Sequence, residues 1–222
     1  VGSYIVSMTR DVSDLLVVYL FQREVGLVES TPEGLRCLLP VVPLFETVGD
    51  LRRSPAILGG FLAHPVTARS LPRARSGEPV VQLMVGYSDS NKDGGIVAAQ
   101  WGLNRAQREL ADAARAAGAA PKFFHGRGGT TSRGAGPLHR FLGALAHGSL
   151  GGGFRMTEQG ETVAQNYANL ITCTYNLELL LSGVTAATLR HSGPPSPLDA
   201  ELAPAMDALA AASTRAYRAL IE

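Results

Sequence analysis

The sequence has few charged side chains, only two cysteines and no long apolar run. Its 20 basic and 19 acidic residues give a formal net charge of +1. A charge so close to zero leaves no basic footprint for nucleic acid or for an anionic membrane surface. No run approaches the 18 consecutive apolar residues that a membrane-spanning helix needs. The sequence therefore predicts a protein that binds neither nucleic acid nor membrane.

The cysteines and the amino end indicate where the protein works. Cys37 and Cys173 lie in apolar runs without metal-ligand spacing. We expect reduced core residues of a cytoplasmic protein, with a disulfide as the less favoured alternative. The opening VGSYIVSMTRD lacks the basic and apolar regions of a signal peptide. It starts on Val1 and soon enters an apolar run, as expected of a segment of a longer protein.

Short apolar runs alternate with longer helical patterns, which predicts an α/β protein with parallel strands. Strands are expected at 4–8, 37–46, 80–88, 122–126 and 154–158, and helices at 12–25, up to about 62, 96–117, 161–183 and about 199–221. A closed (β/α)₈ barrel needs eight such units and about 250 residues. The chain is therefore expected to form a partial TIM-type (β/α)₈ barrel with additional helices, which it cannot close alone.

The chain is expected to divide near residue 190. Residues 1–190 would form the partial barrel and carry the chemical motifs. Residues 191–222 contain the proline-rich segment HSGPPSPLDAELAP and an alanine-rich helix. This second part is expected to be a linker and a helix that belong to the rest of a larger enzyme.

Chemically unusual residues come directly after the predicted strands. Glu46 follows one strand, Asp89 and Lys92 follow the next, and His125 with Arg127 follows the apolar start of another. The carboxyl ends of parallel strands lie on one side of the sheet, so this placement brings carboxylates, cationic side chains and an imidazole together there. The alternative is that each residue separately caps a helix or forms a surface ion pair.

The segment GYSDSNKDGG, residues 86–95, contains two aspartates, one lysine and three glycines. A hard cation such as Mg²⁺ takes oxygen ligands from one or two carboxylates and from substrate. Glu46 and Asp89 would suit that role. An ordinary turn has a similar composition, but so many polar groups directly after a buried strand favour a site.

The segment FHGRGGTTSRGAGP, residues 124–137, contains five glycines and two arginines. It is not a phosphate loop of the Walker type, since no Lys-Ser/Thr pair follows the glycines. Glycines let backbone N–H groups approach an anion, and Arg127 and Arg133 can each bind phosphate through two parallel hydrogen bonds. A flexible linker is the alternative, and the paired arginines favour an anion site.

Two other segments resemble sites but favour structural roles. His64 in AHPVT lies near a helix end among ordinary residues. In RMTEQGE, residues 155–161, Glu161 lies near the start of a predicted helix, where a carboxylate is stabilising. Arg155 could face the mouth of the sheet, although a structural role is favoured.

Taken together, the motifs resemble those of the phosphoenolpyruvate carboxylase family, and the similarity covers most of the chain. The matching strings, in family order, are SMTRDVSDLLVVYLFQREVGL (7–27), PLFET (43–47), MVGYSDSNKDGG (84–95), FHGRGGTTSRGAGP (124–137), TEQGE (157–161) and YANLITCTYNLELLLSGV (167–184). Ala135 replaces a common glycine and Leu83 a usual β-branched residue. The family's TAHPT-type motif with its catalytic histidine is absent, and His64 is not its equivalent because it falls between PLFET and GYSDS.

The resemblance implies a cytoplasmic lyase of carbon dioxide fixation and the tricarboxylic acid cycle. It would form oxaloacetate and phosphate from phosphoenolpyruvate and bicarbonate, as a homotetramer when complete. Mg²⁺ or Mn²⁺ would be held by Glu46 and Asp89. This segment alone is expected to be inactive, because the histidine motif is missing. The alternatives are another metal-dependent barrel enzyme acting on phosphoenolpyruvate, and a non-catalytic fragment.

The resemblance also assigns roles to the cationic residues. Arg127 and Arg133 would bind the migrating phosphoryl group and its developing charge. His125 would bind and orient the phosphate, and Lys92 would act in catalysis by orienting the aspartate segment.

Overall fold

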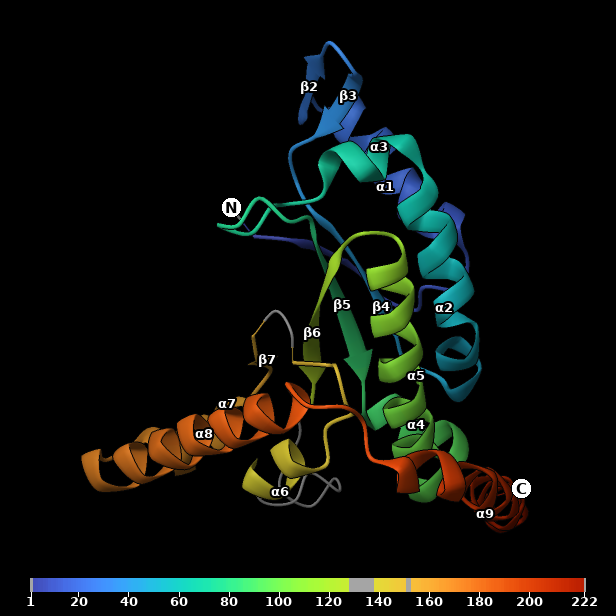
Figure 1. The fold of residues 1–222 in the computed structure, drawn as a ribbon, viewed down its shortest axis with the longest axis vertical. Coiled ribbons are helices and arrows are strands. Elements are labelled where there is room, and N and C mark those ends of the chain that lie inside the picture. The colour runs from blue at the N-terminus through green and yellow to red at the C-terminus, as the bar shows by residue number, and fades with distance from the viewer. Residues whose placement is uncertain (1, 128–137, 151–152, 222) are drawn as a thin grey trace.

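The computed structural model describes residues 2–127, 138–150 and 153–221 (Figure 1). Its main sheet has five strands, all paired in parallel, in the order β1-β4-β5-β6-β7. These strands are β1 Tyr4–Val6, β4 Val41–Phe45, β5 Val80–Gly86, β6 Ala120–Gly126 and β7 Arg155–Met156. The predicted α/β class with a parallel sheet is therefore confirmed. Within the described residues the sheet is open, with β1 and β7 at its edges.

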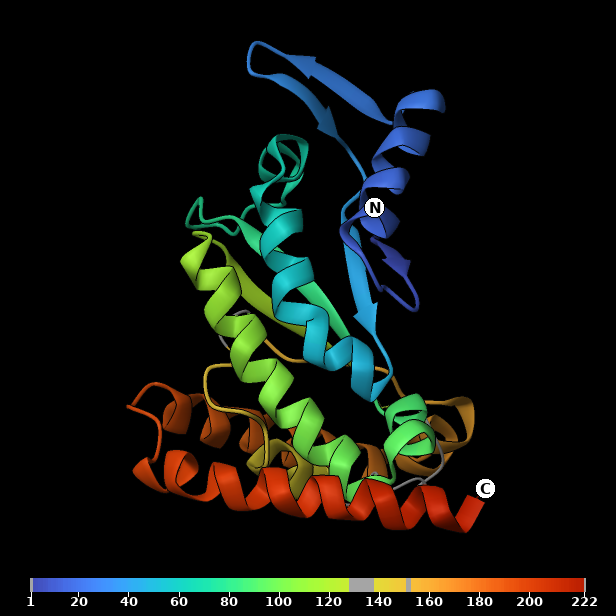
Figure 2. The same cartoon turned by 90° about the vertical axis from the view of Figure 1, so that its right-hand side faces the viewer.

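Nine helices lie within the described residues. They are α1 Val12–Glu24, α2 Val48–Ala63, α3 Pro65–Ser70, α4 Ser88–Gly94, α5 Ile96–Ala116, α6 Leu138–Gly143, α7 Gly160–Tyr167, α8 Leu170–His191 and α9 Pro197–Ile221. Figures 1 and 2 show α2 and α5 side by side over one face of the sheet, and α9 running across the lower end of α5.

The main core lies between the sheet and these two helices. Along β5, Val81, Leu83 and Val85 are buried and face the helices, whereas Gln82 and Met84 on the other face are only half-buried. This alternation follows from the two-residue period of a strand. Each fully buried valine or leucine contributes roughly 1.5–3 kcal/mol by leaving water. The packed face fixes the register of the central strands, and the register sets which residues lie side by side at the strand ends.

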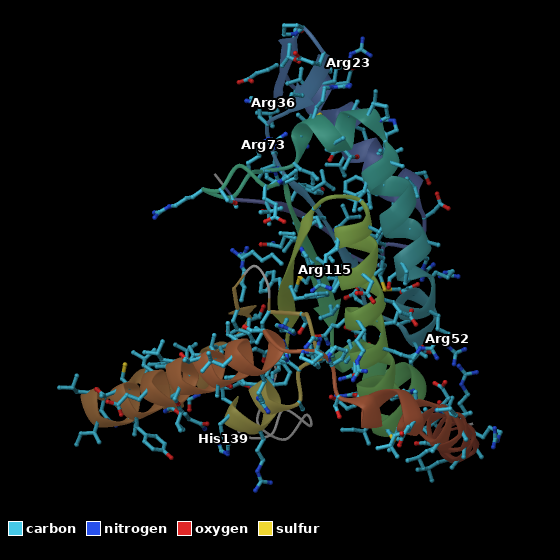
Figure 3. All side chains as sticks on the ribbon, in the orientation of Figure 1. Arg23, Arg36, Arg52, Arg73, Arg115 and His139 are labelled. Carbon is cyan, nitrogen blue, oxygen red and sulfur yellow. The ribbon has the colours of Figure 1, made fainter. Side chains whose placement is uncertain are left out.

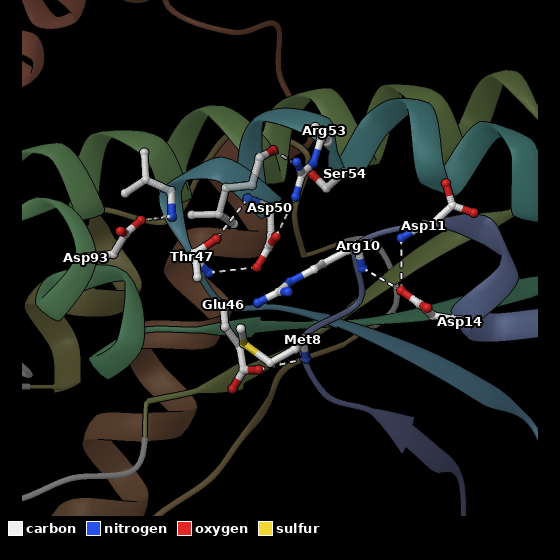
Figure 4. A network of polar contacts seen from close by, with 12 residues as sticks. Met8, Arg10, Asp11, Asp14, Glu46, Thr47, Asp50, Arg53, Ser54 and Asp93 are labelled. Carbon is white, nitrogen blue, oxygen red and sulfur yellow. Dashed lines mark hydrogen bonds and ion pairs between the residues drawn. The ribbon is translucent and has the colours of Figure 1, made fainter.

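The start of α2 is set by a reciprocal cap directly after β4. The hydroxyl of Thr47 accepts a hydrogen bond from the backbone N–H of Asp50 at 3.0 Å, and the Asp50 carboxylate accepts one from the N–H of Thr47 at 3.2 Å (Figure 4). Such caps contribute about 1 kcal/mol. Because the helix must begin at this point, the preceding residue, Glu46, is held at the end of the strand.

The predicted strand over 37–46 is two elements. Its first residue, Cys37, ends β3 Gly34–Cys37, which pairs antiparallel with β2 Val28–Thr31, and residues 41–45 form β4. Pro40 between them has no N–H for a sheet ladder, which explains the interruption. The apolar pattern did not reveal the β2–β3 hairpin. The run at 4–8, expected to be a buried strand, is the short and partly exposed edge strand β1.

The predicted single helix over 161–183 is wrong, because it is two helices. α7 ends at Tyr167 and α8 begins at Leu170. Asn169 between them is extended, and its side chain accepts a hydrogen bond from the N–H of Thr172 at 3.0 Å. Asparagine is a strong amino-terminal cap, and this cap starts a new helix. Gly183, expected to end the helix, lies inside α8, where an added Cβ would lie 2.6 Å from Leu142 Cδ1.

Helix α8 extends away from the sheet, with side chains in solvent along its length (Figure 3). Leu170, Ile171 and Leu189 are more than two-thirds exposed. By length and composition alone, α8 is the one described helix apolar enough to cross a membrane, and a single helix of this kind is weak support for a span. Both cysteines are free thiols; Cys37 is buried, as expected, and Cys173 on α8 is half-buried.

Candidate functional site

The sequence-predicted site residues that the structure describes lie at or just beyond the carboxyl ends of β4, β5 and β6. Strand register pairs Phe45 with Val85 and Val85 with His125, and the next row pairs Gly86 with Gly126. Glu46 follows Phe45, so three neighbouring strands end together. Glu46, the segment that carries Asp89, and Arg127 therefore stand at the ends of adjacent parallel strands. Their role as one site stays a prediction. Arg133, Ala135 and most of the glycine-rich segment lie outside the described residues.

Glu46 is held in place by backbone from two neighbouring strands. Its Oε2 accepts a hydrogen bond from the N–H of Met8 at 2.8 Å (Figure 4). Met8 follows β1 and has a φ of 52°, a left-handed conformation that is uncommon outside glycine. On the other side, a Cβ at Gly86 would lie 3.1 Å from Glu46 Cγ and 3.3 Å from its Cα. Glycine at position 86 therefore leaves room for the backbone and side-chain stem of Glu46.

Asp89 lies in the first turn of the short helix α4. The segment GYSDSNKDGG, for which an ordinary turn was the alternative, therefore forms a short helix after β5. The Lys92 ammonium lies 3.4 Å from Asp89 Oδ1, and both side chains are about half exposed or more. An exposed ion pair of this kind contributes little to stability. Both groups therefore remain accessible to a ligand.

Buried Ser90 ties α4 to the ends of β4 and β5. Its hydroxyl donates to the backbone carbonyl of Glu46 and, at 3.0 Å, to that of Gly86. Asp93 at the other end of α4 accepts a hydrogen bond from the N–H of Val48 at 2.9 Å. These contacts join the segment that carries Asp89 to the strand end that carries Glu46.

Helix α9 also contacts the α4 segment. The Tyr217 hydroxyl donates to the carbonyl of Lys92 at 3.0 Å, and the Thr214 hydroxyl donates to that of Gly94 at 3.2 Å. Gly95, with a φ of 77°, lies against Tyr217, whose ring would be 3.0 Å from an added Cβ. The distant alanine-rich helix therefore covers the end of the predicted aspartate motif. The division of the chain at residue 190 stays a prediction.

His125 lies on the helix-covered face of the sheet, with an exposed fraction of 1%. Its Nδ1 lies 2.9 Å from the hydroxyl oxygen of Tyr87, and its ring stacks on Phe154 and meets the edge of Phe141. Burial, followed by the charge of Arg127, lowers the pKa of His125 from 6.5 to about 4. The imidazole is therefore neutral at physiological pH. A direct contact between His125 and substrate stays a prediction.

Arg127 is half-buried at the carboxyl end of β6. Its guanidinium carbon lies 4.6 Å from the centre of the Phe141 ring, a distance at which a cation is attracted to an aromatic face. Burial lowers the pKa of Arg127, while Tyr87 and Glu158 act in the opposite direction. The arginine is thus placed by an aromatic residue on α6, beyond the glycine-rich segment.

Tyr87 and Phe141 were not predicted from the sequence. Tyr87 stands within the GYSDS string directly after a buried strand, and this position was a usable signal. Phe141 gave no signal, because it lies in an ordinary helical pattern and meets Arg127 only in the folded chain.

The two carboxylates fit the ligand preference of a hard divalent cation. Within the described residues there is no group of three or more histidine, cysteine, aspartate or glutamate side chains that could hold a metal. Mg²⁺ does not need such a group, since it usually keeps several waters and binds one or two carboxylates plus substrate oxygens. Glu46 and Asp89 supply two carboxylates from neighbouring strand ends.

The three residues for which the sequence favours a structural role are His64, Arg155 and Glu161. His64 links the end of α2 to the start of α3. Arg155 donates to the Gln82 side chain at 3.0 Å and lies over the Phe124 ring. Glu161 lies in the first turn of α7, as expected.

A cavity of about 370 Å³ lies at the opposite end of the sheet, where the strands begin, and Arg73 is one of its lining residues. Figure 3 shows Arg73 at this end of the molecule and His139 at the other. It is lined by Tyr19, Gln82 and Lys122 among others, and by none of the predicted site residues.

Comparison with known proteins gives consistent matches along the chain. The family model described as phosphoenolpyruvate carboxylase matches residues 1–222. The phosphoenolpyruvate carboxylase of Methylorubrum extorquens is 45% identical over 221 residues, which cover 100% of this chain and 24% of that protein. The enzymes of Synechococcus sp. WH7803 and Xanthomonas oryzae pv. oryzae are 43% and 44% identical, over 99% of this chain and 22% and 24% of their own lengths. The chain thus spans less than a quarter of these relatives.

Proposed function

Because this chain belongs to the phosphoenolpyruvate carboxylase family, we propose that it is an internal part of a cytoplasmic enzyme that forms oxaloacetate and phosphate from phosphoenolpyruvate and bicarbonate. The observation that carries the proposal is the meeting of Glu46, the Asp89 segment and Arg127 at the ends of three neighbouring parallel strands. We further propose that the open sheet is part of a (β/α)₈ barrel completed by the rest of the polypeptide, and that the complete enzyme is a homotetramer.

Glu46 and Asp89 would hold a divalent cation, Mg²⁺ or Mn²⁺. When bound, the cation supplies positive charge that stabilises the enolate oxygen formed in the reaction. The Met8 N–H donates to one oxygen of Glu46 and fixes the orientation of the carboxylate, which leaves its other oxygen for the cation. Lys92, beside Asp89, would orient that carboxylate and reduce charge repulsion when substrate approaches.

Arg127 would bind the phosphoryl group of phosphoenolpyruvate, together with Arg133. An oxygen of bicarbonate attacks phosphorus and the bond from phosphorus to the enol oxygen breaks, which yields carboxyphosphate and the enolate of pyruvate. Carboxyphosphate then separates into carbon dioxide and phosphate, and the enolate carbon bonds to carbon dioxide to form oxaloacetate. A fixed guanidinium stabilises the charge that develops on the transferring group.

The first test is the assay of the complete polypeptide that contains residues 1–222. Oxaloacetate should form from phosphoenolpyruvate only when bicarbonate and Mg²⁺ or Mn²⁺ are both present. Consumption of phosphoenolpyruvate without bicarbonate would instead indicate another metal-dependent enzyme of the same substrate. No turnover by the complete polypeptide would indicate a non-catalytic protein.

A further inference from the structure

The link between Tyr87 and His125 joins the two halves of the proposed site. Tyr87 precedes Asp89 by two residues, and His125 precedes Arg127 by two residues. Their side chains, 9% and 1% exposed, meet at 2.9 Å between the phenol oxygen and Nδ1. A single buried hydrogen bond therefore connects the segment with the predicted cation ligand to the segment with the predicted phosphate ligand.

The hydrogen bond between Tyr87 and His125 can form with either proton arrangement. The phenol hydroxyl can donate to Nδ1 when the neutral imidazole carries its proton on Nε2, and Nδ1 can donate to the phenol oxygen in the other tautomer. The link between the two rings therefore does not depend on the direction of the bond.

The His125 ring is fixed by packing as well as by this bond. Phe154 stacks on it with centroids 5.4 Å apart, and Phe141 meets it edge-on at the same distance and an angle of 87°. The same Phe141 ring lies beneath the guanidinium of Arg127. A change in the position of His125 would therefore be passed to Arg127 through shared packing.

The backbone alone does not fix the two segments beyond this point. The last paired residues of β5 and β6 are Gly86 and Gly126, and glycine restricts the backbone least. After them, α4 begins on one strand and the glycine-rich segment on the other. The side-chain link is thus placed where the ladder of the sheet ends.

We propose that the Tyr87–His125 hydrogen bond is a strut that sets the position of Asp89 relative to Arg127, so that cation and phosphate are bound together. Tyr87 and His125 act as positioning residues. The inference rests on the proposed function, because it assigns ligands to Asp89 and Arg127. It predicts that the strut determines how strongly the cation strengthens phosphoenolpyruvate binding.

The test is the dissociation constant of phosphoenolpyruvate with and without Mn²⁺, measured in the absence of bicarbonate on the complete polypeptide. Tyr87→Phe removes one oxygen and keeps the ring. The matched control is Tyr19→Phe. It removes the hydroxyl of a tyrosine that is also buried but lies at the opposite end of the sheet, where the strands begin. The unfolding midpoints of both variants show how much stability is lost when a buried tyrosine hydroxyl is removed.

In the wild type, Mn²⁺ should improve affinity for phosphoenolpyruvate by about tenfold or more, within the usual range for coupled sites. Tyr87→Phe should reduce this improvement at least fivefold, whereas Tyr19→Phe should leave it unchanged. An unaltered improvement in Tyr87→Phe would overturn the strut. A wild type that binds no phosphoenolpyruvate would overturn the proposed function, and the strut with it.

A second pair of variants keeps the test decisive if Tyr87→Phe does not fold. In His125→Asn the side-chain carbonyl can accept the phenol proton near the position of Nδ1, whereas His125→Leu offers no acceptor. Both lose the imidazole ring and its packing. The improvement of phosphoenolpyruvate affinity by Mn²⁺ should persist in His125→Asn and be lost in His125→Leu. An equal improvement in the two variants would contradict the proposal.

Discussion

The carboxylate of Glu46 accepts a hydrogen bond at 2.8 Å from the backbone N–H of Met8, a residue that follows the neighbouring strand in a left-handed conformation. This contact links the edge strand β1 to the residue predicted to bind the cation. An amide in place of the carboxylate could still accept from Met8, so charge and geometry can be tested separately.

Glu46→Gln should weaken activation by Mn²⁺ by about a hundredfold or more, because the cation site loses one negative charge, while the unfolding midpoint changes little. The measurement is the Mn²⁺ concentration that gives half-maximal activity of the complete polypeptide. Glu29→Gln, which removes an exposed carboxylate paired with Arg36, is the control and should leave activation unchanged. Unchanged activation in Glu46→Gln would remove this residue from the cation site.

Gly86→Ala should lower activity at least tenfold and destabilise the fold by about 1–3 kcal/mol, since the added methyl group would crowd Glu46. Gly59→Ala is the matched control, because an added Cβ at this position in α2 meets nothing within 4 Å. It should be neutral or stabilise by roughly 0.4–1 kcal/mol. Activity and denaturant unfolding measured on both variants separate the two effects, and an active Gly86→Ala protein would refute the steric argument.

Arg127→Ala should lower kcat by about 10²–10³ and change KM less, as expected for a charge that acts mainly in the transition state. The structure adds a stability cost of about 0.5–2 kcal/mol, because the guanidinium packs on Phe141. Arg155→Ala breaks a similar contact, at 4.2 Å from the Phe124 ring, and should leave kcat within about twofold of the wild type. Equal effects of the two variants on kcat would contradict a special role for Arg127.

Stability should fall as pH falls from about 6.5 to about 4, because of His125. Its folded pKa of about 4 lies below the ordinary histidine value of 6.5, so in this window the unfolded chain takes up a proton that the folded chain excludes. The loss can reach on the order of 3 kcal/mol. Arg127 and the Tyr87 phenol are the ionisable groups beside the ring. His125→Phe should flatten this part of the pH profile, whereas substitution of exposed His139 by glutamine should not.

The sequence predicted the features that depend on local composition. Short, mainly apolar runs located β5 and β6, and polar residues directly after them located Asp89 and Arg127. The features that were missed depend on contacts between distant segments. The Tyr87–His125 bond requires the register of β5 against β6, and Arg127 meets Phe141 only after α6 folds back. The α7–α8 break depended on a single capping residue, Asn169, within an otherwise continuous helical pattern.

The most direct measurement of the central claim follows the oxygen of bicarbonate. The complete polypeptide is given phosphoenolpyruvate, Mg²⁺ and bicarbonate labelled with ¹³C and ¹⁸O, and the products are examined by mass spectrometry. Attack of bicarbonate on phosphorus predicts ¹³C in oxaloacetate and one ¹⁸O in each phosphate, with both products nearly absent in Arg127→Ala. Phosphate without ¹⁸O, or phosphate released when bicarbonate is omitted, would contradict the account.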